Sequence, residues 1–183
     1  MTQRAEVASP GRSYNHPCLI AQALDVLGDR WTLIILRDLM TGLEHFNDIL
    51  DNCDGLSPNV LSSRLKRLEA EGLVERHYHR DLPPRVTYNL TEKGWAVRPV
   101  LVSLIQWSGT YGRSITPESV GTDVSADFVA RVIPAFAFDP ECAAGVTASL
   151  RIELTDCEEC RDWTLVIGGG RIIPQRNYPA KPT

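Results

Sequence analysis

The segment SPNVLSSRLKRLEAEGL (57–73) decides the fold of the first half of this chain. On a helix with 3.6 residues per turn, three leucines share one narrow stripe, which predicts a side facing a hydrophobic core. These are Leu61, Leu65 and Leu68. Ser57 and Gly72 are residue types preferred at helix ends, and Pro58 suits the first helical position. The segment is therefore predicted to form an amphipathic helix with a defined start and end.

The opposite side of this helix carries small polar groups and cations. They are Asn59, Ser62, Ser63, Lys66 and Arg67. A solvated face usually carries Glu and Lys four residues apart, whereas amides, hydroxyls and cations are the groups that contact DNA phosphates and base edges. We interpret this side as a nucleic-acid-binding face, with a merely solvated face as the alternative. Arg64 lies nearer the leucine stripe, where a phosphate and an acidic residue of the same domain are both suitable partners.

The net charge of −4 is unevenly distributed along the 183 residues. Residues 1–113 hold 13 basic and 13 acidic side chains, whereas residues 114–183 hold 6 and 10. Within residues 57–98 there are 8 basic and 5 acidic side chains, a local balance of +3. The acidic whole-chain average therefore hides a basic patch of the kind that nucleic-acid-binding proteins carry.

The cysteines do not predict a disulfide framework or a metal site. There are five: Cys18, Cys53, Cys142, Cys157 and Cys160. An odd number scattered through a chain of this length predicts reduced thiols. The one Cys-x-x-Cys pair, 157–160, supplies two of the four ligands of a tetrahedral site, and His77 and His79 have no third ligand nearby in the sequence. We expect no metal and no cofactor.

No segment predicts a membrane span or a secretory signal. The longest apolar run, residues 33–36, is far shorter than a bilayer requires, and the N-terminal 17 residues lack the apolar core of a signal peptide. These observations predict a cytoplasmic protein without a membrane partner. We also find no nucleophile, base or acid pair in a catalytic motif, so we expect no enzymatic activity.

The organisation of the chain predicts a winged helix-turn-helix domain followed by a small α+β domain, an α+β fold overall. Helices are expected over 18–28, over 29–42 with Asp29 as N-cap and Gly42 as terminator, and over 45–53. Segments 74–80 and 86–90 alternate polar and apolar residues, which predicts a hairpin, or wing. A long helix should start after Thr91, and Pro99 should kink it.

Residues 1–14 are predicted to be a loose arm, 15–113 the winged-helix domain, 114–126 a linker and 127–183 the C-terminal domain. This last part should contain a helix over 127–136 and strands over 146–154 and 163–169, with GGGR (168–171) at the tight end of the last strand. Two strands and one helix are marginally stable alone, so the C-terminal domain is expected to need docking or a partner.

Several segments resemble the HxlR-type winged-helix regulators, a branch of the MarR-like group. They are CLIAQALDVLGDRWTLIILRDLMTG (18–42), HFNDIL (45–50), GLSPNVLSSRLKRLEAEGLVERHYHRDLPPRVTYNLTEKG (55–94) and RPVLVSLIQW (98–107). The resemblance implies a bacterial transcriptional regulator, more often a repressor, that binds a pseudo-palindromic operator in double-stranded DNA as a homodimer. It implies that helix 57–71 enters the major groove, and that the kinked helix after Thr91 forms the dimer contact.

The residues and the resemblance together predict a DNA-binding set. It comprises Ser57, Asn59, Ser62, Ser63, Lys66, Arg67, Arg80 and Arg85. The side chains in the middle of the helix are expected to reach base edges, and Arg67 lies nearer the rim, where phosphate is the expected target. Arg80 and Arg85 bracket the wing turn, where a minor groove or its flanking phosphates are within reach.

Two features suggest that a small molecule regulates DNA binding. Cys18 matches the position at which many HxlR-type relatives carry a redox-sensing or electrophile-sensing cysteine, although Leu19 stands where those relatives have proline. A small buried residue is the alternative role for Cys18. SLRIELTD…RDWTLVIGGGRI (149–172) resembles one hairpin of the sterol-carrier-protein fold, which binds lipids, but the segment is shorter than that domain. Phe128, Val132, Phe136, Phe138 and Trp163 then line either a ligand site or a simple core.

A rival function is a winged helix used only for protein association or ligand binding. Weak, salt-insensitive binding to DNA would favour this rival. The basic wing and the polar helix face favour the regulator.

Overall fold

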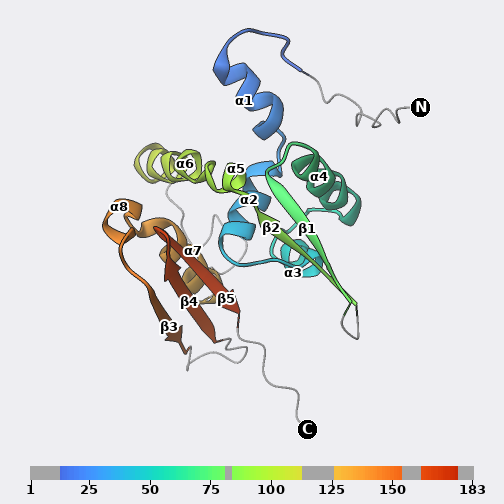
Figure 1. Ribbon diagram of the computed structural model, residues 1–183. Coiled ribbons are helices and arrows are strands. Elements are labelled where there is room, and N and C mark those ends of the chain that lie inside the picture. The colour runs from blue at the N-terminus through green and yellow to red at the C-terminus, as the bar shows by residue number, and fades with distance from the viewer. Residues whose placement is uncertain (1–12, 81–83, 113–125, 154–161, 177–183) are drawn as a thin grey trace, which may run out of the picture. The chain divides into compact units, whose positions relative to one another are not determined.

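The computed structural model describes residues 13–80, 84–112, 126–153 and 162–176. By its internal contacts the chain forms two compact units. Unit 1 comprises residues 1–39 and 43–97, and unit 2 comprises residues 40–42 and 98–183. Helices and two separate antiparallel sheets make up these units, which confirms the predicted α+β class (Figure 1).

Unit 1 has the element order of a winged helix-turn-helix, as predicted. Its elements are α1 (Leu19–Leu27), α2 (Thr32–Met40, whose last residue belongs to unit 2), α3 (Phe46–Asp51), α4 (Pro58–Ala70), β1 (Val74–His79), β2 (Arg85–Leu90) and α5 (Glu92–Trp95). Helix α4 is the helix that the quoted segment predicts. Strands β1 and β2 form the antiparallel wing, with Val74 opposite Leu90 and His79 opposite Arg85.

Helix α4 begins and ends at the residues that its sequence indicates. The Ser57 hydroxyl oxygen accepts a hydrogen bond from the Val60 backbone N–H at 3.4 Å, and Pro58 occupies the first helical position. At the other end Gly72 has a φ of +70°, a left-handed conformation that glycine adopts without steric cost. The Gly72 N–H donates to the Glu69 carbonyl and the Leu73 N–H to the Leu68 carbonyl. This pair of bonds is a Schellman motif, which directs the chain into the wing.

The leucine stripe of α4 lies in the core of unit 1. Leu61, Leu65 and Leu68 are at most 2% exposed, as predicted. Further large buried side chains of this core come from α2, α3, the loop after α3 and the junction between α4 and β1. They include Ile35, Leu36, Leu39, Ile49, Leu56, Leu73 and Val74. Burying three leucines on one helix contributes several kcal/mol, at roughly 1.5–3 kcal/mol for each side chain, so this stripe fixes the rotation of α4 about its axis.

A buried carboxylate ties α2 to the end of α3. Asp38 is fully buried, and its two oxygens accept hydrogen bonds from Arg37, Asn52 and the Cys53 thiol. Burial and the neighbouring Asp38 charge raise the pKa of Cys53 to about 12. Cys53 therefore stays a neutral donor to Asp38, because deprotonation would place two negative charges side by side.

The predicted N-cap of α2 is wrong. Helix α2 begins at Thr32 rather than directly after Asp29, and a turn over residues 29–31 precedes it. The Thr32 N–H donates to the backbone carbonyl of Asp29, while the Asp29 carboxylate pairs with two arginines of α4. The Asp29 carboxylate is therefore bound by Arg64 and Arg67 and does not cap α2.

The predicted long helix after Thr91 is two helices. Thr91 caps α5, accepting from the Gly94 N–H at 3.1 Å, but α5 ends at Trp95 and α6 (Arg98–Tyr111) begins after a turn. Pro99 has no N–H for the Trp95 carbonyl, and its ring would clash with that carbonyl in a continuous helix. In the first turn of α6 the missing N–H costs nothing. The proline therefore breaks the helix where a kink was predicted.

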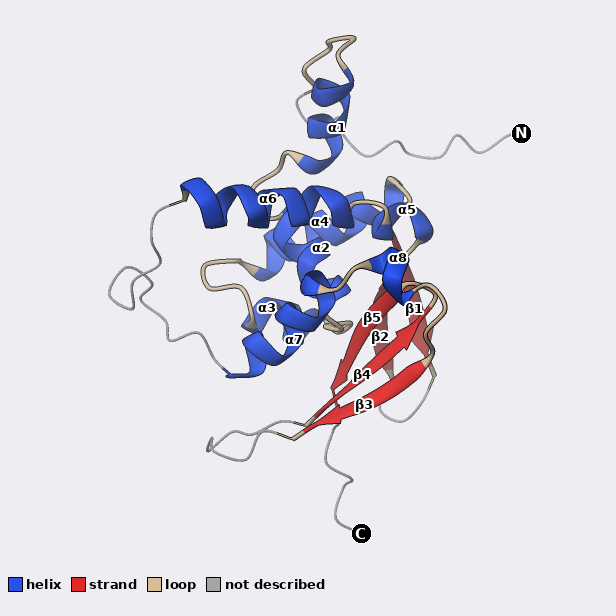
Figure 2. Cartoon of the chain, turned by 90° about the vertical axis from the view of Figure 1, so that its left-hand side faces the viewer, coloured by secondary structure: helices blue, strands red, loops and turns tan. Residues whose placement is uncertain are grey.

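Unit 2 contains α6, α7 (Ala126–Ala137), α8 (Pro140–Ala143) and a three-stranded antiparallel sheet. The strands are β3 (Ala148–Ile152), β4 (Trp163–Gly168) and β5 (Arg171–Arg176), in the order β3-β4-β5. Helix α7 packs against β4 and β5 (Figure 2). The predicted helix and first two strands are confirmed, whereas α8 and β5 were not predicted.

Strand β5 corrects the role given to GGGR. Gly169 and Gly170 have φ values of +56° and +70°, so they form the tight turn of a β4–β5 hairpin rather than the end of the last strand. Two successive residues with positive φ are typical of a type I′ hairpin turn. The sequence did not predict this strand because it contains Pro174, and proline is rare in central strands. Among the described strands, β5 lies at an edge of the sheet, where proline is tolerated.

Two arginines hold unit 2 together. Arg98 donates to the carbonyls of Ala135, Phe136 and Phe138 at 3.1–3.3 Å, so its cation caps the C-terminal end of α7. Burial lowers the pKa of Arg98. Arg131, only 1% exposed, donates to Asp127 and Thr41.

Because Arg98 binds the end of α7, helix α6 belongs by its contacts to unit 2. The sequence placed the end of the first domain at residue 113. The division into units by contacts instead falls between residues 97 and 98. The expected linker lies almost wholly outside the described residues. A bilayer span needs about 20 apolar residues. None of the helices in the described parts of the chain meets that requirement.

Candidate nucleic-acid interface

The side of α4 opposite the leucine stripe is open to solvent. Asn59, Ser63 and Lys66 are exposed, and Ser62 is half-buried. Their positions follow from the helical period, because burial of Leu61, Leu65 and Leu68 forces the intervening residues outward. An amide, two hydroxyls and an ammonium group thus share one face, with both donors and acceptors available for base edges and phosphates.

Ser57 has a structural role that remains compatible with a contact. Its oxygen accepts from Val60, which leaves the hydroxyl hydrogen to donate elsewhere. The residue is exposed at the N-terminus of α4, where backbone N–H groups point outward and favour an anion.

Arg64 and Arg67 point toward the start of α2 instead. Both guanidinium groups pair with the Asp29 carboxylate, Arg64 at 2.7 Å and Arg67 at 2.9 Å. Arg67 also donates to the backbone carbonyl of Asp25. Of the two partners suggested for Arg64, the acidic residue is the one found. Arg67 was expected to contact a phosphate. At least two of its hydrogen-bond donors instead bind groups of unit 1.

The wing has two chemically different faces. Across the strands Glu75 pairs with Asn89, His77 with Thr87 and His79 with Arg85, and these six side chains share one face. The other face carries the pairs Val74 with Leu90, Arg76 with Tyr88 and Tyr78 with Val86. Arg80 directly follows β1, and Arg85 begins β2. Both are exposed at the distal end of the wing, beside residues 81–83, which the structure does not describe.

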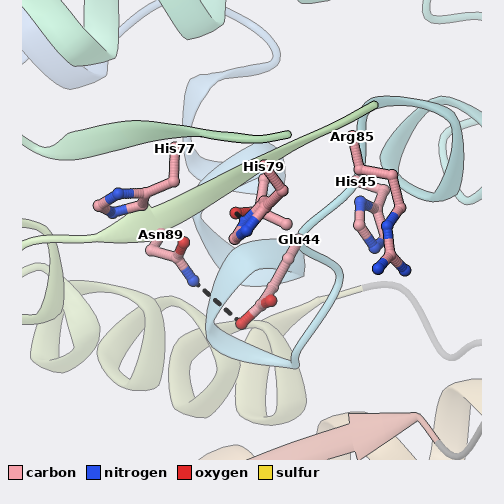
Figure 3. A pocket seen from close by; sticks show the side chains of 7 residues that line it. Glu44, His45, His77, His79, Arg85 and Asn89 are labelled. Carbon is pink, nitrogen blue, oxygen red and sulfur yellow. Dashed lines mark hydrogen bonds between the residues drawn. The ribbon is translucent and has the colours of Figure 1, made fainter. Parts of the chain in front are cut away.

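The segment between α2 and α3 fixes the wing to unit 1. The Tyr88 N–H donates to the Glu44 carbonyl at 2.8 Å, and the Asn89 amide donates to the Glu44 carboxylate at 3.0 Å. His45 Nδ1 lies 3.2 Å from the Val86 carbonyl oxygen. Figure 3 shows Glu44 and His45 beside the polar face of the wing. These bonds hold β2 to the body of the unit, so the wing has a defined position relative to α4.

Two exposed wing residues were missed by the sequence analysis. Arg76 and Tyr78 lie on the same face of β1, and Tyr78 is 63% exposed. A cation beside an exposed aromatic ring suits contact with a sugar-phosphate backbone. The alternation of VERHYHR was the available signal, because Arg76, Tyr78 and Arg80 are two residues apart.

The cysteines differ in accessibility. Cys18 is exposed at the N-terminus of α1, and the Ala21 and Ile20 backbone N–H groups lower its pKa by stabilising the thiolate. Its exposure does not agree with the alternative role of a buried core residue. Cys157 and Cys160 lie outside the described residues. Within those residues, no group of three or more His, Cys, Asp or Glu side chains is arranged to hold a metal ion.

Comparison with known proteins identifies the architecture. Residues 26–116 match the family model described as HxlR-like helix-turn-helix. Over 97 residues the chain is 35% identical to the uncharacterized HTH-type transcriptional regulator sll1512 of Synechocystis, covering 53% of this chain and 72% of the relative. It is 40% identical over 87 residues to the uncharacterized HTH-type transcriptional regulator YvaP of Bacillus subtilis, covering 48% of this chain and 81% of YvaP. The chain belongs to the HxlR-like helix-turn-helix family.

A solved structure agrees with this assignment. The crystal structure of PA1607, a proposed transcription factor, superposes with a TM-score of 0.51 at 32% identity, covering 59% of this chain and 73% of PA1607. This HxlR-like chain is therefore a transcriptional regulator and not an enzyme, as the sequence predicted. Helix α4 is the second helix of its helix-turn-helix.

Proposed function

We propose that this HxlR-like regulator binds a pseudo-palindromic operator in double-stranded DNA as a homodimer, with α4 in the major groove. The observation that carries the proposal is the exposed polar face of α4, opposite a leucine stripe that is almost completely buried. The local balance of +3 over residues 57–98 supports it, because cations supply most of the affinity for the phosphate backbone.

The proposed contacts fall into two groups. Asn59, Ser62, Ser63 and Lys66 face base edges, and Ser57, Arg80 and Arg85 face phosphates. Arg67 remains a rim contact in this proposal, with fewer donors for phosphate because Asp29 and Asp25 already accept from it. Arg76 and Tyr78 extend the wing contact along β1.

The homodimer is supported by apolar side chains that two helices expose. On α6 these are Val100, Leu104, Ile105, Trp107 and Tyr111, each between 43% and 74% exposed. On α1 they are Leu19, Ile20 and Leu24, between 43% and 79% exposed. Large apolar residues gathered on one helix mark a protein-binding surface, and symmetric dimers are the commonest assembly.

We further propose repression in the cytoplasm, with release from DNA by an electrophilic or small hydrophobic effector. The lowered pKa and exposure of Cys18 support the electrophile, because the thiolate is the reactive form. In unit 2, Trp163 and Phe136 are buried, whereas Phe128, Val132 and Phe138 are only partly covered. The partly covered side chains support a hydrophobic effector site there.

The test is a titration of the full chain against duplexes from the region flanking its own gene and against a shuffled duplex, at two salt concentrations. We expect tight, sequence-selective binding that weakens steeply with salt. Equal affinity for both duplexes would reduce the surface to a non-specific basic patch. An absence of binding at either salt concentration would support the rival function of protein association.

A further inference from the structure

A recess lies on the polar face of the wing, and of its lining residues only Arg85 belongs to the proposed DNA contact. It has a volume of about 390 Å³. Its lining comes from β1, β2 and the segment before α3: Glu44, His45, His77, His79, Arg85, Thr87 and Asn89. Three of the four histidines in the chain thus meet here with an arginine (Figure 3).

The polar groups of this recess are a guanidinium, three imidazoles, a hydroxyl, an amide and a carboxylate. Its one carboxylate, Glu44, already accepts from the Asn89 amide at 3.0 Å. The His79 Nε2 lies 2.9 Å from the Thr87 hydroxyl, which orients that imidazole. At the rim, His77 lies 3.6 Å from Glu75, another carboxylate, which is itself largely exposed. Arg85 adds a permanent positive charge.

The His45 ring can present either an acceptor or a donor to the recess. Its Nδ1 faces the Val86 carbonyl, and a carbonyl only accepts, so Nδ1 carries the hydrogen. In the neutral ring Nε2 is then an acceptor, and it becomes a donor only when the ring gains a proton. An anion in the recess favours that proton, because opposite charges stabilise each other.

A metal ion does not suit this site. Although three imidazoles line it, the described residues contain no group of three or more His, Cys, Asp or Glu side chains arranged to hold a metal. An arginine in the lining would also repel a cation. Guanidinium, imidazolium and hydroxyl groups together are instead the usual partners of phosphate and carboxylate oxygens.

We propose that this recess binds a small oxyanion, a phosphate or a carboxylate, and that the bound anion competes with DNA. Binding of the anion itself is independent of the proposed function, whereas the competition rests on it. Arg85 belongs both to the recess and to the proposed phosphate contact. An anion that engages Arg85 therefore withdraws a cation from DNA and adds negative charge beside the wing.

The first experiment uses the full chain labelled with ¹⁵N, without DNA. Imidazole signals are followed by NMR during titration with inorganic phosphate and, separately, with citrate, at pH 6 and pH 8. Sodium chloride keeps the ionic strength constant. The two titrations distinguish a phosphate from a carboxylate ligand. His16, which precedes α1 and does not line the recess, is the internal control.

We expect saturable shifts of the His45, His77 and His79 signals, with tighter binding at pH 6 and no shift of His16. His77→Gln should weaken binding about tenfold, the effect of losing one charge-assisted hydrogen bond. The matched control is Arg76→Gln, the preceding residue on the opposite face of β1, and it should change the affinity less than twofold. Linear or absent shifts, or equal weakening by both variants, would overturn the proposal.

The second experiment measures duplex affinity with citrate or phosphate replacing chloride at equal ionic strength. We expect the wild-type affinity for the duplex to fall several-fold and the His77→Gln affinity to fall clearly less at the same anion concentration. Saturable anion binding without any DNA binding would contradict only the proposed function. DNA binding without saturable anion binding would contradict only the oxyanion site.

Discussion

At the scale of single residues, Asp29 decides which cations of α4 face solvent. Its carboxylate pairs with Arg64 and Arg67, and the two arginines have equal side-chain exposure of 26%. Lys66, between them in sequence, points to the opposite side and is exposed. Three neighbouring cations that look alike in the sequence therefore differ in the structure: Arg64 and Arg67 are paired with Asp29, whereas Lys66 is exposed on the other side of α4.

Lys66→Ala is expected to weaken operator binding about three- to tenfold. It should also reduce the slope of log affinity against log salt concentration by about one, because one cation that neutralises a phosphate is lost. Fluorescence anisotropy at several salt concentrations measures both quantities. Arg151→Ala is the control: Arg151 is an exposed cation on β3, outside the proposed interface, and its removal should leave both unchanged. An unaltered slope for Lys66→Ala would exclude Lys66 from the DNA contact.

The exposed cysteines are expected to differ in reactivity. Backbone N–H groups lower the pKa of Cys18, whereas the Asp139 carboxylate beside Cys142 raises the pKa of that thiol. At neutral pH more of Cys18 is therefore thiolate, and alkylation by iodoacetamide should be faster at Cys18 than at Cys142. As pH rises, the Cys18 rate should level off first.

Peptide-resolved mass spectrometry follows each thiol in the native protein. Cys53, buried and with a pKa of about 12, should stay unmodified until the chain unfolds, so it serves as the control. Cys18 alkylation no faster than that of a free model thiol would contradict its proposed role as a sensor.

At the scale of elements, the end of α4 determines where the wing starts. The Schellman motif at Gly72 satisfies the last carbonyls of the helix, and the Thr91 hydroxyl donates to the Gly72 carbonyl at 2.7 Å. The Lys93 ammonium donates to the Glu71 carbonyl at 2.6 Å. The C-terminus of α4 and the end of β2 are therefore joined directly, which holds the wing beside the helix.

Gly72→Ala is expected to destabilise the protein by about 1 kcal/mol, because a φ of +70° is unfavourable for alanine. A Cβ at this position would meet no other atom, so the change isolates backbone strain. Chemical denaturation measures the free energy of unfolding. The control is Gly109→Ala in α6, which also has open space but an ordinary helical φ. Gly109→Ala should stabilise the protein by about 0.5–1 kcal/mol, a change opposite in sign to that of Gly72→Ala. Effects of the same sign would contradict the role given to Gly72.

At the scale of the whole molecule, the division into units places a proposed dimer helix in unit 2. Arg98, the first residue of α6, caps α7, so α6 shares its unit with the C-terminal sheet. A ligand in this sheet would therefore act on the same unit that carries the exposed apolar side chains of α6. The buried Arg131 ties α7 to Thr41, at the end of α2, within that unit.

Trp107→Arg is expected to convert the proposed dimer to a monomer, because an exposed tryptophan at the proposed interface would be replaced by a charge that cannot be desolvated cheaply. Light scattering after size-exclusion chromatography measures the mass. Ile133→Arg on α7, an exposed position of similar accessibility, is the control and should remain dimeric. Loss of the dimer in the control alone would assign the interface to α7.

Much of unit 1 could be predicted because its signals are local. The stripe of Leu61, Leu65 and Leu68, the Ser57 cap and the Gly72 terminator each act within one or two helical turns, and the alternation of the wing acts within one strand. The errors arose where a distant residue competes with a local rule. Asp29 has a favourable N-cap position, but two arginines about 35 residues later attract its carboxylate more strongly than a single backbone N–H.

The sequence by itself determined the winged helix-turn-helix, the helix face directed outward and the family, because periodicity and end signals reflect the covalent chain and its nearest neighbours. Only the tertiary structure decided which cations are already paired, where the helix after Thr91 breaks, and that β5 pairs with β4 in the C-terminal sheet. It alone brought His45 to the two wing histidines and Arg85. Such long-range contacts depend on how separate elements pack, and no spacing within one element specifies that packing.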